Sequence, residues 1–293
     1  MATSSQSPTP QSRDWAALWA QKNTSWDKGS ANPAFVDFLR SPSNPPLSPD
    51  ANPTPGAPEP GVYEHTEEVR LPAPMKADGT RRKALVPGCG TGYDVALLAS
   101  WGYDAYGLEI SKHAVDEANA YLKHAEESGS EGEYQVKDEK IGRGSAQCLL
   151  GDYFNDAWLR VAGGEEGFDI IYDHTFLCAL PLLLRPRWAT RTRSLLCPTG
   201  ILVCIEFPAH KPASAGGPPF SLPPTVHVEL LKRPGEEVTY DDDGVVVATD
   251  REESADALAR IAHWTPRKSH AQVNGIVPCC VSVWRHKKTA GRL

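Results

Sequence analysis

The chain has 293 residues, of which 40% are apolar and 23% are charged, and its formal net charge is −7. This length suits one α/β domain that buries a full core. The mild acidity, without a dense lysine and arginine patch, excludes nucleic acid as the main partner. The longest apolar runs have the length of strands, whereas a membrane-spanning helix needs about 20 apolar residues, so no membrane span is expected.

The N-terminus and the cysteines indicate a cytoplasmic protein. Residues 1–12 are polar and predicted to be disordered, and they lack the charged and apolar regions of a signal peptide. The 7 cysteines include no C-x-x-C pair, which favours buried free thiols over a zinc site. No sequence pattern marks an obligate interface, so residues 13–293 are expected to form a single domain that remains a monomer.

Tryptophans at helical spacing follow the polar N-terminus. Asp14 is placed to cap a helix that carries Trp15 and Trp19 on one face, and Trp26 follows shortly after. By itself this pattern indicates an amphipathic helix packed on the domain. Residues 41–61 are so rich in proline that they exclude a helix or a central strand, which predicts an extended surface linker.

Residues 84–111 have the layout of a βαβ nucleotide-binding unit. A short apolar run enters a turn that contains Gly88, Gly90 and Gly92, a helical segment follows, and a second apolar run ends at Glu109. The glycines let a ligand approach the backbone where a Cβ would clash. A carboxylate after the second strand is typical of ribose-diol binding.

The turn does not favour a dinucleotide. A pyrophosphate-binding turn has a further glycine at the position that Tyr93 occupies, and Asp94 follows directly. An acidic turn disfavours phosphate and favours a cationic ligand. The sulfonium cofactor S-adenosylmethionine (SAM) therefore fits better than NAD or FAD, which disfavours an NAD-dependent oxidoreductase.

The rest of the chain continues the alternation of helices and strands. The expected elements are a helix over 112–125, a solvated loop over 126–144, and strands over 145–150, 168–172, 201–207, 258–264 and 277–284. Residues 232–258 are acidic and are predicted to form a surface insertion. Asp173 and His174 follow the strand over 168–172, where the carboxyl ends of parallel strands form ligand sites.

Several blocks in order resemble one enzyme family. The run from Gly88 to Asp94, followed by Gly-Leu-Glu-Ile-Ser at 107–111, is similar to SAM-dependent methyltransferases of the thiopurine methyltransferase superfamily. That group includes plant thiol and halide methyltransferases and fungal dithiol methyltransferases of the gliotoxin type. The tryptophans before residue 27, the block over 176–189 and the Gly-Gly-Pro-Pro segment at 216–219 match it as well.

The resemblance implies a class I methyltransferase fold, α/β and Rossmann-like. The expected sheet has seven strands, mostly parallel, with helices on both faces and an N-terminal helical lid over residues 13–40. SAM is the implied cofactor, and S-adenosylhomocysteine is the product.

The resemblance also assigns residues to the cofactor. Trp19 is the main contact of a lid that folds over SAM, and Asp152 binds the adenine amino group, unless it only caps a helix. The implied cofactor-binding residues are Trp15, Trp19, Trp26, Gly88, Gly90, Glu109, Ile110, Asp152, Tyr153, Phe154 and Asp173.

The acceptor pocket is implied in the same way. Its substrate-binding residues are Trp26, Phe176, Gly217 and Pro218, although Gly217 and Pro218 also suit a purely structural turn. Many relatives have a tyrosine where this chain has His174, so the identity of the base stays open.

A soft acceptor is favoured by the chemistry. A thiol with a pKa of about 8.5 costs only about 2 kcal/mol to ionise at neutral pH, whereas an alcohol needs a strong base or a metal. No metal constellation is visible in the sequence. We hypothesise that Asp173 or His174 assists deprotonation, with Tyr172 as a third catalytic candidate.

The function expected from the resemblance is S-methylation of a small thiol in the cytosol. The most specific hypothesis is a fungal enzyme of secondary metabolism that methylates both thiols of a reduced epipolythiodioxopiperazine. A halide, hydrosulfide or thiopurine acceptor is the alternative within the enzyme class. A non-catalytic SAM-binding protein is the alternative outside it.

Overall fold

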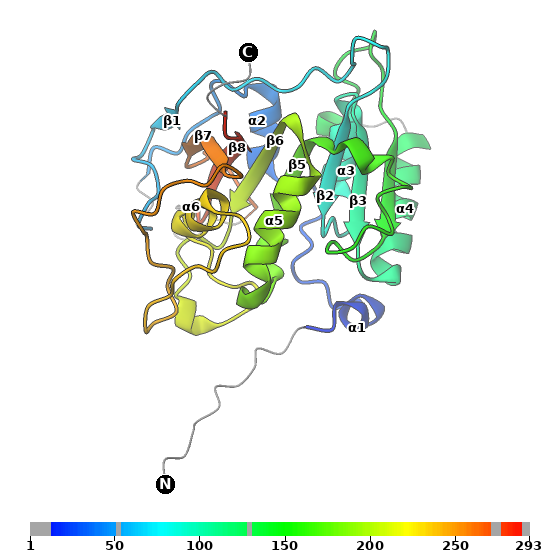
Figure 1. Cartoon of the computed structure of the whole chain (residues 1–293). Coiled ribbons are helices and arrows are strands. Elements are labelled where there is room, and N and C mark those ends of the chain that lie inside the picture. Colours follow the sequence, from blue (N-terminus) through cyan, green and yellow to red (C-terminus); the bar gives the residue numbers. More distant parts are fainter. Residues whose placement is uncertain (1–12, 51–53, 128–130, 271–276, 289–293) are drawn as a thin grey trace.

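One mixed sheet organises the molecule (Figure 1). The computed structural model describes residues 13–50, 54–127, 131–270 and 277–288, so the predicted disorder of residues 1–12 lies outside the described part. The strands are β1 (Tyr63–His65), β2 (Lys83–Pro87), β3 (Asp104–Glu109), β4 (Ala146–Leu150), β5 (Phe168–His174), β6 (Leu196–Glu206), β7 (Leu258–Trp264) and β8 (Cys280–His286). Their order is β1-β7-β8-β6-β5-β2-β3-β4.

The sheet has a parallel and an antiparallel part. Strands β4, β3, β2, β5 and β6 pair in parallel, while β8 runs antiparallel between β6 and β7. This is the predicted class I methyltransferase arrangement. Within the described residues the sheet has 8 strands rather than seven, because β1 pairs antiparallel with β7 at the edge. A strand of 3 residues is too short for its alternation to be recognised in the sequence.

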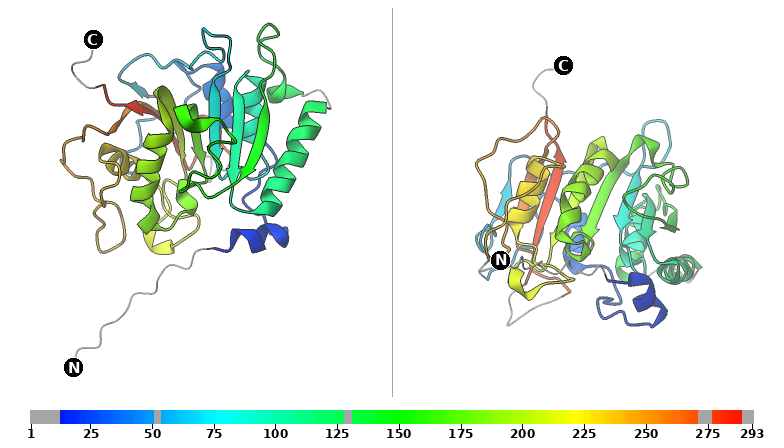
Figure 2. Two further views of the ribbon diagram at one scale, coloured as in Figure 1. Left: turned by 45° about the vertical axis from the view of Figure 1, so that its right-hand side comes forward. Right: turned by 60° about the horizontal axis from the view of Figure 1, so that its bottom comes forward.

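Helices cover both faces of the sheet (Figures 1 and 2). The α-helices are α1 (Trp15–Ala20), α2 (Pro33–Arg40), α3 (Tyr93–Ser100), α4 (Lys112–Glu127), α5 (Arg185–Leu195) and α6 (Pro224–Lys232). Single 3-10 turns span Gly132–Tyr134, Gly164–Glu166, Leu177–Ala179, Leu182–Leu184 and Ala213–Ala215. Buried residues of α2, α3 and α4 share one core cluster, and those of α5 and α6 share the other.

Helix α2 belongs to the core. Asn32 caps it by accepting the Ala34 N–H at 2.9 Å, and Pro33 supplies a preset φ at its first position. Its apolar side chains, Phe35 and Phe38 among them, are fully buried. Burial of each aromatic ring contributes about 1.5–3 kcal/mol, so this helix is fixed to the sheet.

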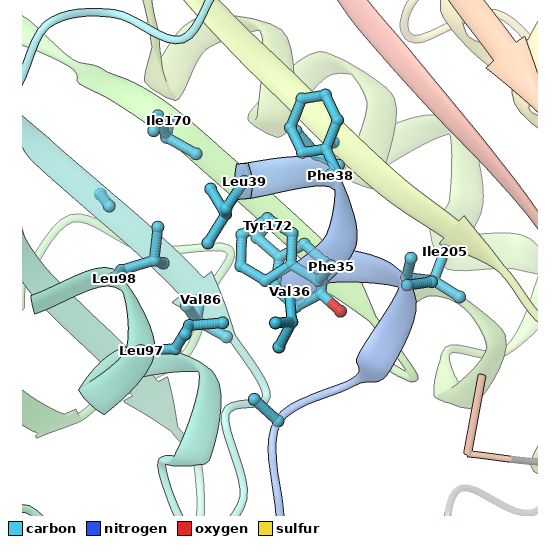
Figure 3. Close-up of a cluster of buried hydrophobic side chains, with 14 of the residues drawn as sticks. Phe35, Val36, Phe38, Leu39, Val86, Leu97, Leu98, Ile170, Tyr172 and Ile205 are labelled. Carbon is cyan, nitrogen blue, oxygen red and sulfur yellow. The ribbon is translucent and has the colours of Figure 1, made fainter. Parts of the chain in front are cut away.

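The packing of α2 assigns a structural role to Tyr172 (Figure 3). The Phe35 ring stacks on the Tyr172 ring with centroids 3.7 Å apart, and Phe38 packs on Trp264 at 5.7 Å. Tyr172 is completely buried, and within the described residues its hydroxyl has no hydrogen-bond partner. The second half of the segment 13–40, which was predicted to be lid, therefore packs in the core, and Tyr172, the third catalytic candidate, is a buried core residue.

Two segments predicted to be solvated are partly anchored. In the described part of 41–61, the Ser48 N–H donates to the Thr265 carbonyl at 2.9 Å, so this stretch packs against the end of β7 instead of crossing open surface. In the acidic segment 232–258, Val238 and Val246 are buried in the core cluster of α5 and α6. No helix in the described ranges is both long and apolar enough to span a bilayer.

Candidate active site

A cleft of about 710 Å³ opens at the carboxyl ends of the parallel strands. Helix α1 lies below these ends, beside α4 (Figures 1 and 2). The predicted site residues that line the cleft are Trp15, Trp19, Trp26, Gly88, Gly90, Glu109, Ile110, Asp152, Tyr153, Phe154, His174, Phe176 and Pro218. Tyr172, Asp173 and Gly217 do not line it. The volume is within the roughly 300–1,000 Å³ typical of small-molecule sites.

The glycine turn after β2 requires glycine at position 88. Gly88 has φ +60°, which L side chains rarely adopt, and a Cβ there would lie 2.7 Å from Cδ2 of Phe176. At Gly90, with φ +55°, a Cβ would lie 3.8 Å from Cζ2 of Trp19. The backbone of the turn is thus packed between Phe176 and Trp19, with no room for a side chain at Gly88.

Glu109 connects the end of β3 to this turn. Its Oε1 accepts the Gly90 N–H at 2.9 Å, and its Oε2 accepts the Ile110 N–H at 3.3 Å. Burial raises the pKa of Glu109 to about 7. Each carboxylate oxygen has a further lone pair, so the group is able to accept two hydroxyl donors from a diol in the cleft.

Three indole rings line the cleft beside the glycine turn. The Trp26 ring meets those of Trp15 and Trp19 edge to face, with centroids 5.3 and 6.0 Å apart. The Thr91 hydroxyl donates to Asp27 Oδ2 at 2.5 Å, which joins the segment after α1 to the glycine turn. The N-terminal segment is therefore connected to the cofactor side of the cleft through side chains that the motif does not contain.

The loop after β4 supplies the third wall. Asp152 is exposed, and its Oδ1 accepts the Phe154 N–H at 2.9 Å, so it caps a turn and no helix starts there. Tyr153 is buried, with its hydroxyl 2.8 Å from Thr192 Oγ1. The Phe154 ring lies 4.8 Å from the guanidinium carbon of Arg187, a cation–π contact that sequence reasoning missed.

Asp173 has a structural role that the sequence did not reveal. Its Oδ1 accepts the Leu177 N–H at 3.1 Å and its Oδ2 accepts the indole N–H of Trp188 at 2.8 Å. Burial raises the pKa of Asp173 to about 6. Both oxygens hold the turn that follows β5, only 2% of the residue is exposed, and Asp173 does not line the cleft, so the geometry gives it a positioning role for this turn.

His174 lines the cleft at the end of β5. Its Nε2 lies 3.1 Å from Nδ2 of Asn32, and its Nδ1 lies 3.9 Å from Oδ2 of Asp94. Asn32 Oδ1 already accepts from Ala34, so the Asn32 amide nitrogen is the donor to His174. This bond assigns the lone pair of His174 to Nε2 and its proton to Nδ1, facing Asp94.

The residue after His174 is strained. Thr175 has φ +61°, a conformation that is rare for a β-branched side chain, and it lines the cleft. Such strain persists only where the surrounding structure enforces it, and it concentrates at functional sites.

A second histidine, His270, completes this end of the cleft. Its ring centroid lies 5.7 Å from that of His174, and its Nε2 lies 3.1 Å from the Ala31 carbonyl oxygen, to which it donates. Within the described chain its Nδ1 has no hydrogen-bond partner. Burial lowers the pKa of His270. The sequence contains no motif around His270 that indicates this position.

The acceptor side also includes apolar residues that were not predicted. Pro219 lines the cleft with the predicted Pro218, while Gly217 packs under Phe220. The further lining residues on this side include Cys178, Leu180, Pro181, Leu184 and Phe207. Most of them lie in the apolar run after Phe176, which is the one signal from which they could have been found.

The residues of the cleft fit SAM. The buried Glu109 carboxylate retains acceptor capacity for a ribose diol, the glycine turn exposes backbone, and the indole faces suit a sulfonium cation. When bound, SAM supplies an electrophilic methyl group whose leaving group is a neutral thioether.

Comparisons with known proteins agree with this geometry. The family model of thiopurine S-methyltransferase matches residues 71–269, more than half of the chain. A probable thiol methyltransferase 2 of Arabidopsis thaliana is 33% identical over 60% of this chain and 64% of its own length. Thiocyanate methyltransferase 1 of the same plant is 28% identical over 74% of this chain and 70% of its own length.

One similar solved structure is magnesium protoporphyrin IX methyltransferase from Synechocystis with bound SAM. It is 15% identical in sequence, the alignment covers 69% of each chain, and the TM-score is 0.38. The alignment with the Arabidopsis thiol methyltransferase spans a little less than two thirds of that relative. By the family match, the strand order and the residues of the cleft, the chain belongs to the thiopurine S-methyltransferase family of SAM-dependent methyltransferases.

Proposed function

We propose that this chain transfers the methyl group of SAM to the sulfur of a small-molecule thiol, and that its acceptor is a reduced dithiol of the epipolythiodioxopiperazine type, methylated on both sulfurs. The observation that carries the proposal is the histidine pair, His174 and His270, on the wall of a cofactor cleft. Imidazole is a weak base, which suits a thiol of pKa about 8.5 and not an alcohol. The names of the plant relatives, thiol and thiocyanate methyltransferases, support a sulfur acceptor.

The cofactor is held by the side of the cleft nearest the glycine turn. Glu109 accepts the ribose hydroxyls, Asp152 accepts from the adenine amino group, and Tyr153 and Phe154 flank the adenine ring. Helix α1 acts as a lid, with Trp19 against the cofactor at Gly90. Its side-chain connection to the glycine turn through Asp27 and Thr91 supports a lid that closes as the cofactor binds.

The acceptor is placed between the histidines and the apolar wall around Phe176 and Pro218. We assign the general base to His270, because its Nε2–H is held by the Ala31 carbonyl and its Nδ1 lone pair has no partner among the described residues. This nitrogen is buried, so the proposed proton transfer requires the acceptor thiol to displace the side chains that cover it. The lone pair of His174 is occupied by Asn32, so His174 donates through Nδ1–H and lies beside Asp94, whose charge stabilises an imidazolium nearby.

In the proposed reaction His270 takes the proton of the acceptor S–H. The thiolate sulfur then forms a bond to the methyl carbon in line with the bond that breaks, and the leaving sulfur becomes neutral. The protein contributes mainly orientation, because an in-line displacement needs the two sulfurs and the carbon aligned. Solvent receives the proton from His270 after the product leaves.

The size of the cleft supports the dithiol over the smallest acceptors. A halide or hydrosulfide requires a tight apolar pocket, whereas about 710 Å³ leaves room for a cofactor and a bicyclic acceptor together. Thiopurine is the alternative of comparable size, and the experiment distinguishes it.

The test is mass spectrometry of products after incubation with SAM and each of five acceptors: a reduced epipolythiodioxopiperazine, a simple thiol, 6-mercaptopurine, thiocyanate and iodide. We expect the dithiol to gain two methyl masses at the lowest concentration. Conversion of only thiocyanate or iodide would contradict the dithiol as the acceptor but would still support methyl transfer from SAM. SAM binding without any product from the five would contradict thiol methylation itself.

A further inference from the structure

A row of polar side chains crosses the antiparallel part of the sheet, away from the cleft. In the strand register Glu206 lies opposite Cys280, and His263 lies opposite Ser282. Residues directly opposite each other share a face, and so do residues two apart in a strand. Glu206, His263 and Cys280 therefore point to one face of the sheet, the face that α6 covers (Figure 1).

These three side chains converge. Glu206 Oε2 lies 3.1 Å from His263 Nε2, and one ligand atom each from Glu206, His263 and Cys280 all lie within 4.8 Å of one another. Each of these three residues is at most 1% exposed. The described residues contain no other cluster of this kind.

Helix α6 adds a fourth donor. His227 is completely buried, and its Nδ1 lies 3.7 Å from Glu206 Oε1. Within the described ranges neither ring nitrogen of His227 has a hydrogen-bond partner, and Glu206 Oε1 has none. An unsatisfied buried polar group costs about 1–3 kcal/mol, so this concentration of unused donors and acceptors indicates a missing ligand.

We propose that Glu206, His227, His263 and Cys280 bind one Zn²⁺ ion. A thiolate, two imidazoles and a carboxylate are the ligand types of zinc sites, and four protein ligands with no open position are typical of a structural one. Zn–ligand distances of about 2.0–2.3 Å place tetrahedral ligands roughly 3.3–3.8 Å apart. The 3.1 Å between Glu206 Oε2 and His263 Nε2 is close to this range. His227 Nδ1 lies 3.7 Å from the other Glu206 oxygen, Oε1, so the proposed site requires side-chain rotations that bring His227 to the cluster of Glu206, His263 and Cys280.

The surroundings of the cluster also suit a metal. Glu64 of β1 lies opposite His263, with its Oε2 3.6 Å from His263 Nδ1. A carboxylate on the second nitrogen of a ligating histidine fixes the tautomer and increases its affinity for the metal. A groove of about 500 Å³, lined by Glu64, His263 and Lys232 among others, gives an entry path from the surface.

The site has a structural consequence for the cleft. Glu206 is followed directly by Phe207, which lines the cleft on the acceptor side. An ion bound here would connect β6, β7, β8 and α6 behind that wall without touching the reacting atoms. The sequence predicted no metal site, because no two cysteines have the spacing of a zinc motif. That local pattern does not detect metal ligands that come from three strands and a helix.

The experiment uses the full chain, purified without chelator and then dialysed against Zn²⁺ and metal-free buffer in turn. We expect about one equivalent of zinc per chain by elemental analysis, with a melting temperature that falls when a chelator removes it. Replacement by Co²⁺ is expected to give a thiolate-to-cobalt charge-transfer band and tetrahedral d–d bands, which report ligation by a cysteine independently of catalysis.

Two matched variants make the assignment specific. Cys280→Ser is expected to remove the charge-transfer band and weaken zinc binding at least 10-fold. Cys279→Ser changes the neighbouring buried thiol, which belongs to the core cluster on the opposite face, and is expected to keep both. If Cys280→Ser folds poorly, His227→Gln is a second test of the site. It is expected to weaken zinc binding while the cobalt–thiolate band persists.

Three results would overturn the proposal. They are a wild-type chain that retains no zinc at stoichiometric supply, a melting temperature unaffected by chelator, and an unchanged cobalt spectrum in Cys280→Ser. The first two would mean that Glu206 and the two histidines form a metal-free buried ion-pair network. Methyl transfer is assayed separately, so failure of either proposal does not decide the other.

Discussion

The two sides of the cleft are built in different ways. Apart from the N-terminal tryptophans, the cofactor side comes from one stretch, residues 84–154, where the glycine turn, Glu109 and Asp152 follow successive parallel strands. The acceptor side combines His174, Pro218 and His270, which lie far apart in the sequence. Backbone conformation therefore sets most of the cofactor side, and side-chain packing between distant segments sets the acceptor side.

This difference predicts how each side responds to substitution. A change in the cofactor side disturbs backbone that must approach the ligand closely, so its effects are large and appear as weaker SAM binding. A change in the acceptor side removes one side chain from a cooperating set, so its effects are smaller and appear in the chemical step or in stability.

The largest effect is expected for Gly88→Ala. The new Cβ would lie 2.7 Å from Cδ2 of Phe176 at φ +60°, and together the clash and the positive φ cost about 3 kcal/mol. We expect SAM binding to weaken roughly 100-fold, measured by titration calorimetry. Gly79→Ala is the control, because its φ of +84° gives similar strain and no atom lies within 4 Å of its Cβ. Equal SAM affinity in both variants would show that Phe176 does not press on the turn.

An intermediate effect is expected for His270→Ala. At pH 7 a thiol of pKa about 8.5 is only a few per cent ionised, so loss of the base is expected to lower kcat by at most about 30-fold. The deficit is expected to vanish above about pH 9, where the acceptor ionises without help. The measurement is a pH–rate profile of both enzymes. A deficit that is the same at every pH would assign His270 a positioning role only.

His174→Ala is the matched variant for that profile. The lone pair of His174 accepts a hydrogen bond from Asn32, so His174 is not expected to act as the base. The His174→Ala substitution is therefore expected to lower kcat without changing the shape of the pH dependence. The reverse pattern, with the pH-dependent deficit in His174→Ala and not in His270→Ala, would exchange the two roles.

A smaller effect is expected from the titration of Glu109. Burial raises its pKa to about 7, so in the free protein the carboxylate form that accepts ribose hydroxyls is the minority below that pH and the majority above it. SAM affinity is therefore expected to increase about 10-fold between pH 6 and pH 8. Glu109→Gln is expected to bind more weakly and to lose this pH dependence. A pH-dependent gain that survives in the variant would come from another group.

The smallest effect is expected for Tyr172→Phe. The substitution keeps the ring stacked on Phe35 and removes a buried hydroxyl that has no partner in the described part of the chain. We expect kcat within 2-fold of wild type and an unfolding free energy that is unchanged or about 1 kcal/mol higher, measured by urea denaturation. A large loss of kcat with unchanged stability would return Tyr172 to the catalytic candidates.

The sequence by itself determined the parts of this protein that depend on local geometry. Strand and helix periodicity predicted the strands from β2 to β8, while their arrangement in one sheet was implied by the family resemblance. The motif predicted Gly88, Gly90 and Glu109 at the cleft, because backbone conformation and the carboxyl ends of parallel strands are encoded within a few residues. The N-terminal tryptophans, which the family resemblance implied as cofactor contacts, also line the cleft.

Only the tertiary structure decided what depends on long-range packing. It assigned Tyr172 to the core through α2, directed both oxygens of Asp173 away from the cleft, and brought His270 beside His174. It also gathered Glu206, His227, His263 and Cys280 from three strands and a helix. No spacing rule predicts such groupings, because the contacts arise from strand register and helix packing between segments tens of residues apart.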